Sequence, residues 1–215
     1  MRIVMFFVSM VLFSYPAGAL TDMEKSVLKT ALQGTLEIEY DAQRQRGELV
    51  GCGLSFAVGV SDWLYKAGGL VVINGSLNFY SFPGKVPAYA IKIQPADITV
   101  MDDGSLQKDI VAVDLGYSIF GEHSTANKEI SHFSCDRGGY CAAFGVTQNF
   151  EMVQAVHDGL MSNQFEVAYT RESGNSDVIA KIDLENSPNG EPIPAVIQFL
   201  DCEMKALKAA LNRLQ

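Results

Sequence analysis

The chain has 215 residues, of which 48% are hydrophobic and 19% charged, so its composition excludes a mainly disordered protein and predicts a folded core. Acidic residues outnumber basic ones by 25 to 16, which gives a formal net charge of −9. This balance argues against nucleic-acid binding and against electrostatic docking on an anionic membrane, because both depend on clustered Lys and Arg. The acidity is equally typical of a protein whose charge only maintains its solubility.

The first 19 residues have the three parts of a secretory signal peptide. Arg2 supplies the positive charge, residues 3–13 are apolar, and Ala17-Gly18-Ala19 presents small side chains to a peptidase. We expect cleavage after Ala19, which removes one basic residue and no acid and takes the charge to −10. The protein is then expected in the periplasm or outside the cell. An uncleaved anchor is disfavoured because an apolar run of about eleven residues cannot span a bilayer, and no later stretch predicts an integral membrane segment.

Residues 20–48 are predicted to form an N-terminal helical segment that ends in a polar connector. Thr21 and Glu24 have the spacing of a capping box, and the apolar residues that follow recur at helical intervals until Gly34. Residues 36–40 fit either a short strand or a continued helix, and residues 41–48 are interpreted as the connector. We therefore expect a single β-rich domain at 49–215.

Strand patterns dominate from residue 49 onward. Asn74-Gly75 stands between two apolar runs and predicts a hairpin turn. Residues 102–105 predict an exposed loop. Further strands are expected at 49–60, 89–93, 110–117, 130–135 and 140–146.

The last third of the domain mixes helices with strands. A helix capped by Thr147 or Asn149 is expected to end at Asn163, followed by a hairpin of strands near 165–169 and 178–184. A last strand at 195–200 and a closing helix from Met204 complete the pattern. The predicted fold is mainly β, a β-sandwich or small barrel with an N-terminal helix, one inserted helix and a C-terminal helix.

Four cysteines remain after signal cleavage and predict two disulfides in an oxidising compartment, with three possible pairings. We favour Cys135–Cys141, because the glycines between them allow a tight reversal, and Cys52–Cys202, which closes a long loop. Zinc binding and thiol–disulfide exchange are disfavoured because the sequence contains no C-x-x-C pair. Cys52, which stands between two glycines, is the one candidate for a reactive thiol.

Features after Phe133 resemble a known family. They are Cys135 and Cys141 with glycines between them, Ala142-Ala143-Phe144, and a short helix and strands ending near residue 184. In these features residues 133–200 resemble the invasion-associated locus B family of exported bacterial proteins. The resemblance implies a β-sandwich with two disulfides and no assigned catalytic site. The N-terminal helix and the late Cys202 depart from the family pattern.

The polar residues predict no catalytic, cofactor or metal site. His123 follows Glu122 and His132 lies near Glu129, but neighbours on a strand face opposite sides of the sheet and should not converge. The pair Asp102-Asp103 is better explained by a turn than by acid catalysis or calcium binding.

Aromatic residues between positions 63 and 89 are the candidate ligand platform, for a sugar, a peptide or a lipid. The alternative is that they form the core and its cross-strand pairs. Trp63, close to Gly68-Gly69, is the one most expected at the surface. The platform residues are Trp63, Tyr65, Tyr80 and Tyr89.

The sequence thus favours an exported, non-enzymatic binding or interaction protein. Its expected partner is an envelope protein, a host surface or a small apolar ligand. The alternative is an exported hydrolase with a site around His123, His132 and the neighbouring acids.

Overall fold

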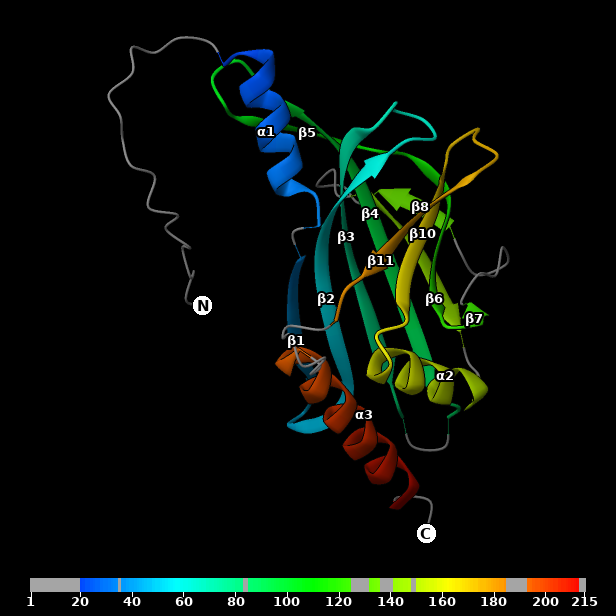
Figure 1. The fold of residues 1–215 in the computed structure, drawn as a ribbon. Helices are drawn as coiled ribbons and strands as arrows, with labels where there is room; N and C mark the ends of the chain where they lie inside the picture. Colours follow the sequence, from blue (N-terminus) through cyan, green and yellow to red (C-terminus); the bar gives the residue numbers. More distant parts are fainter. Residues whose placement is uncertain are drawn as a thin grey trace.

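The computed structural model describes residues 20–34, 36–82, 85–124, 132–135, 141–147, 150–184 and 193–212. The predicted signal peptide, residues 1–19, lies outside this range. Two antiparallel sheets pack face to face and carry an N-terminal, an inserted and a C-terminal helix (Figure 1). The predicted mainly β class is confirmed in its sandwich form, because neither sheet closes into a barrel within the described residues.

The larger sheet, sheet A, is built from long hairpins. Its inward side chains alternate with outward ones, as in β2, where Cys52, Leu54, Phe56 and Val58 are buried. A short strand, β5 (Leu106–Ile110), pairs with the far half of β4. The remaining strands, in spatial order, are β1 (Leu36–Gln45), β2 (Glu48–Asp62), β3 (Gly69–Tyr80), β4 (Ala88–Val100), β9 (Cys141–Thr147) and β8 (His132–Cys135).

The smaller sheet, sheet B, covers part of the inner face of sheet A. Its order is β11 (Asp177–Ile182), β10 (Phe165–Arg171), β6 (Val113–Phe120) and β7 (His123–Ser124). The predicted hairpin between the first two is confirmed. Phe165 joins the sheets, with its ring centroid 5.5 Å from that of Phe56 and 5.1 Å from that of Phe120.

The three helices differ in how deeply they pack. α1 (Asp22–Leu32) has the predicted capping box but no buried residue, and its Lys25 pairs with Asp102 in the β4–β5 loop. α2 (Phe150–Met161) and α3 (Pro194–Asn212) bury apolar stripes against the sandwich. Within the described residues, no helix combines the length and apolarity needed to cross a membrane.

The hairpin turn predicted at Asn74-Gly75 is wrong, because β3 runs straight through both residues. The glycine serves close packing instead. A Cβ atom on Gly75 would lie 2.2 Å from the Phe56 ring, so only glycine lets this ring lie flat on the neighbouring strand. The turn before β3 falls at residues 63–68, and β3 ends at Tyr80, after which residues 83–84 lie outside the described residues.

Two segments have a different secondary structure from the one predicted. Residues 41–45 belong to β1, and the predicted connector shrinks to the turn at Arg46 and Gly47, so the boundary drawn at residue 48 falls inside a hairpin of sheet A. The strand predicted at 195–200 is the first half of α3, which begins at Pro194, where a missing N–H needs no partner. Its buried residues Val196, Phe199 and Leu200 follow helical spacing.

Candidate functional site

The structure does not bring the four candidate platform residues together. Trp63 and Tyr65 lie in the β2–β3 turn, whereas Tyr80 and Tyr89 lie at the other end of β3 and β4. Tyr89 is 1% exposed and belongs to the core, and the Tyr80 ring stacks on that of Phe82. The interpretation of Tyr89 as a ligand contact is therefore wrong, and only Trp63 and Tyr65 share a surface.

Residues 62–69, here called the Trp63 turn, are organised by one buried carboxylate. Asp62 is 0% exposed, and its Oδ1 accepts hydrogen bonds from the backbone N–H groups of Leu64, at 3.0 Å, and Tyr65, at 2.8 Å. Its Oδ2 accepts from Nε and Nη2 of Arg171, at 3.0 and 2.8 Å. Asp62 thus fixes the turn and joins it to sheet B.

Arg171 links the two sheets through a second carboxylate. Its guanidinium donates to Asp97 on β4 at 2.7 and 3.2 Å, and Lys66 of the Trp63 turn lies 2.8 Å from the same carboxylate. Burial works against the charge on Arg171, but the hydrogen bonds and charges of both acids outweigh burial and raise the guanidinium pKa. Burial likewise favours a raised pKa for Asp97, and the bonds from Arg171 and Lys66 outweigh it and lower this pKa.

Two glycines complete the packing of the Trp63 turn. Gly68 has a φ of +83°, and a Cβ there would lie 2.6 Å from the indole of Trp63, so one face of the indole rests on this glycine. The Tyr65 hydroxyl accepts from the backbone N–H of Ser176 at 3.1 Å, and a Cβ on Gly174 would lie 2.4 Å from it. The turn is therefore locked against the β10–β11 loop.

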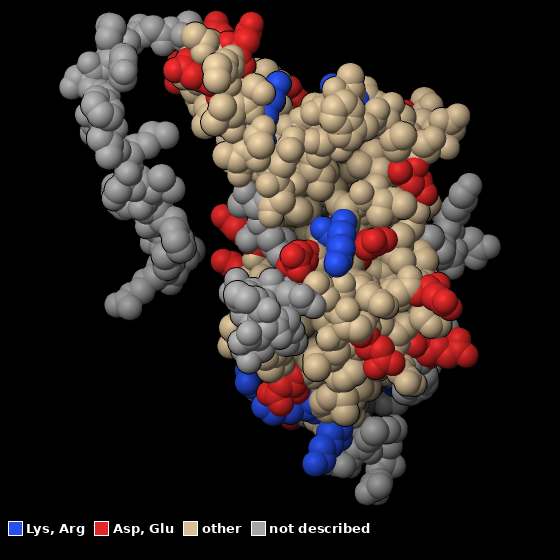
Figure 2. Space-filling model, viewed as in Figure 1, with Lys and Arg blue, Asp and Glu red and all other residues tan. Residues whose placement is uncertain are grey.

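The same turn leaves large apolar side chains in solvent. Trp63 is 75% exposed and Leu64 57% exposed. Uncharged side chains cover most of the upper end of the face in view, where the β2–β3 and β10–β11 turns lie in Figure 1 (Figure 2). The result is a rigid apolar projection at one end of the sandwich.

A second surface feature is an open hollow of about 500 Å³ between α2 and the β6–β7 turn. It is lined by three acids, Glu122, Glu151 and Asp158, together with His123. Glu122 lies in the turn before β7 and not on a strand, so the strand argument does not apply to it, and both Glu122 and His123 line the hollow. Among the described side chains, none forms a hydrogen bond or ion pair with His123, and no cluster could hold a metal ion.

The other histidines do not extend this hollow. His157 is half-buried on α2, and the side chain of His132 lies outside the described residues, so its predicted role with His123 stays a prediction.

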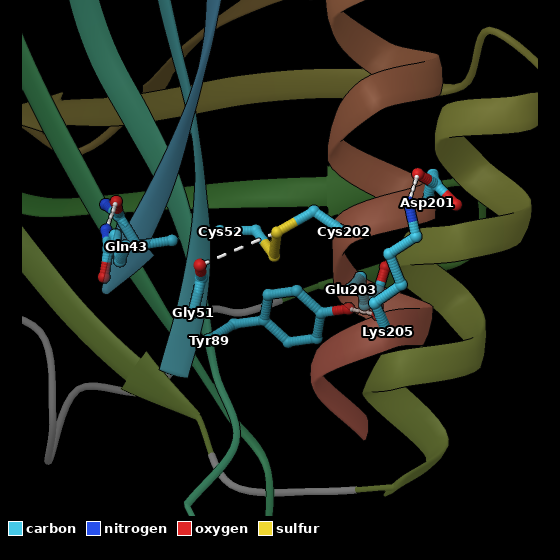
Figure 3. The surroundings of a disulfide bond; sticks show 9 residues. Gln43, Gly51, Cys52, Tyr89, Asp201, Cys202, Glu203 and Lys205 are labelled. Carbon is cyan, nitrogen blue, oxygen red and sulfur yellow. Dashed lines mark hydrogen bonds and ion pairs between the residues drawn. A yellow bond between two sulfur atoms is a disulfide. The ribbon is translucent and has the colours of Figure 1, made fainter. Parts of the chain in front are cut away.

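A disulfide fastens α3 to β2. Cys52 and Cys202 are bonded, with their Cα atoms 6.0 Å apart, and both are buried in the interface that Figure 3 shows. Cys135 and Cys141 lie directly opposite each other on β8 and β9. The side chain of Cys141 lies outside the described residues, so the Cys135–Cys141 bond stays a prediction.

Sequence patterns did not reveal the partners of Arg171. Asp62 and Asp97 lie 109 and 74 residues from it along the chain, and no local motif connects them. The apolar and aromatic content of the Trp63 turn was the one readable signal.

Comparison of the chain with protein-family models, with curated proteins and with solved structures gives no match. The resemblance to the invasion-associated locus B family therefore remains an expectation from residues 133–200 alone.

Proposed function

We propose that this protein is an exported, non-enzymatic binding protein that contacts its partner through the Trp63 turn. The observation that carries the proposal is the exposure of Trp63 and Leu64 on a turn fixed by the buried Asp62. Large apolar side chains in solvent do not stabilise the free domain by burial. A rigid aromatic side chain at the surface is instead the usual centre of a binding interface. Because the turn is already ordered, little conformational entropy is lost when it binds.

The form of the site favours a macromolecular partner over a small apolar ligand. The Trp63 turn lies at one end of the sandwich and leaves Trp63 and Leu64 largely in solvent, so these side chains fit a pocket on another molecule. Export by a bacterium, as the signal-peptide pattern and the family resemblance imply, makes an envelope protein or a host surface protein the natural partner.

A binding comparison with matched variants tests this proposal. The mature protein is immobilised, and binding from a solubilised bacterial envelope fraction and from a host-cell surface extract is measured for wild type, Trp63→Ala/Leu64→Ser and a control. The control is Ile179→Ser, whose side chain is 53% exposed on β11 and so matches Leu64 in exposure. We expect at least about tenfold weaker binding for the double variant alone. Equal binding by all three proteins would contradict the proposal.

The acidic hollow supports the alternative, an exported hydrolase, because His123 and three acidic residues line the same hollow. Hydrolysis of ester, peptide and glycoside reporter substrates by wild type and by His123→Ala decides this point. Turnover by wild type that His123→Ala abolishes would favour the hydrolase. Background rates that are equal for the two proteins would favour the binding protein.

A further inference from the structure

Glu203 is a carboxylic acid buried between α3 and sheet A. Its side chain is 0% exposed, and the hydroxyl of Tyr89 from β4, itself 1% exposed, donates a hydrogen bond to its Oε1 (Figure 3). The other oxygen, Oε2, is buried and has no hydrogen-bond partner among the described residues. An ionised carboxylate without a counter-charge is costly in such a place, so the site fits the protonated acid.

No described positive charge offsets ionisation of Glu203 from the elements packed on α3. β2 contributes the disulfide, which does not titrate, and the Arg44 guanidinium of β1 donates instead to a backbone carbonyl of the β1–β2 turn. β1 also turns Tyr40 towards the core. On α3 itself, Asp201 and Lys205 pair with each other on the exposed side.

The proton on Glu203 is therefore coupled to helix docking. Burial has the largest effect on the Glu203 pKa and raises it from 4.5 to about 7, against the opposing hydrogen bond from Tyr89. Since a docked helix holds a proton that a free helix releases, docking is strongest below pH 4.5 and weakens as the pH rises through 7. The docking constant of α3 should fall about 70-fold between pH 5 and pH 8.

We propose that α3 is a pH-responsive clamp, which docks on sheet A while Glu203 is protonated and loosens when Glu203 ionises. The Cys52–Cys202 bond keeps the loosened helix attached, so the change is a local opening. Opening uncovers the stripe of Val196, Phe199 and Ala206, which is at most 1% exposed in the docked state. The protein thereby covers this apolar surface more tightly in acid than at neutral to alkaline pH.

Hydrogen exchange read by mass spectrometry tests the clamp in the oxidised protein. Opening constants for peptides of α3 are measured from pH 5 to pH 9 and corrected for the pH dependence of intrinsic exchange. We expect the wild-type constant to rise about 70-fold from pH 5 to pH 8, and Glu203→Gln to show a flat profile. The control, Asp201→Asn, removes an exposed acid two residues away along α3 and should keep the wild-type profile.

A wild-type profile that is flat, or that Glu203→Gln shares, would overturn the proposal. Tyr89→Phe gives an independent reading if Glu203→Gln does not fold. Loss of the Tyr89 hydrogen bond removes the one interaction that lowers the Glu203 pKa, so the midpoint of opening should move to higher pH. An unchanged midpoint in this variant would also overturn the proposal.

Discussion

Replacing Asp62 tests whether one buried carboxylate holds the Trp63 turn and the two sheets together. Asp62→Ala removes the acceptor of four hydrogen bonds, two from backbone N–H groups and two from the Arg171 guanidinium. Arg171, whose side chain is 13% exposed, keeps its contacts to Asp97. Breaking a buried pair costs about 3–5 kcal/mol when the remaining charge has no partner, and because Arg171 keeps Asp97 the expected loss is at the lower end, about 3 kcal/mol.

Asp62→Asn separates charge from shape. The amide oxygen can still accept from the N–H groups of Leu64 and Tyr65, while the negative charge that faces Arg171 is lost. The amide nitrogen then points its N–H groups at the donors of Arg171, so we expect this variant to lose about as much stability as Asp62→Ala, about 3 kcal/mol. Asp201→Ala is the control, because the Asp201–Lys205 pair on α3 is well exposed and should contribute less than about 0.5 kcal/mol.

The assay is urea unfolding followed by far-UV circular dichroism, with the disulfides kept oxidised. Equal slopes among the variants would show that the change lies in stability and not in the compactness of the unfolded chain. An Asp62→Ala cost as small as that of Asp201→Ala would refute the reasoning, since Asp62 would then be an incidental contact.

Three further changes test the packing of the fold. The double variant Cys52→Ser/Cys202→Ser opens a loop of sequence separation 150 and should lose up to about 5 kcal/mol in urea unfolding, and an unchanged midpoint would contradict the role of this bond. Gly75→Ala places a Cβ 2.2 Å from the Phe56 ring and should cost about 1–3 kcal/mol, visible as a lower Tm, and a Tm equal to wild type would show that the ring can move aside. Phe165→Ala removes the ring that contacts both Phe56 and Phe120 and should cost about 3–5 kcal/mol in the same assay, whereas a loss under 1 kcal/mol would place the inter-sheet core elsewhere.

The sequence was most informative where a signal is local. The capping box at Thr21 and Glu24 and the alternation of β10 and β11 are determined by neighbours along the chain, and both were predicted correctly. The turn predicted at Asn74-Gly75 was wrong because Gly75 makes room for the Phe56 ring of the neighbouring strand β2. This requirement of tertiary packing has the same sequence pattern as a turn. The strand predicted at 195–200 was wrong because a short apolar run has the same composition in a buried helix and in a strand.

The candidate site was predictable only in part, for a similar reason. Exposure of Trp63 could be anticipated from the glycines beside it, but the Asp62–Arg171–Asp97 network depends on the pairing of distant strands. The Tyr89–Glu203 contact joins residues 114 positions apart and has no sequence signature. Sheet packing, which single-sequence patterns do not specify, decides all of these contacts.

Fluorescence of Trp63 tests the central claim most directly, because it is the only tryptophan in the chain and reports on the Trp63 turn alone. Acrylamide quenching is measured on the mature protein alone and with saturating amounts of the envelope or host-surface fraction that it binds. The account predicts strong quenching in the free protein, where the indole is 75% exposed, and a several-fold lower quenching constant with a blue-shifted emission in the complex. Binding that leaves both the emission and the quenching of Trp63 unchanged would contradict the account.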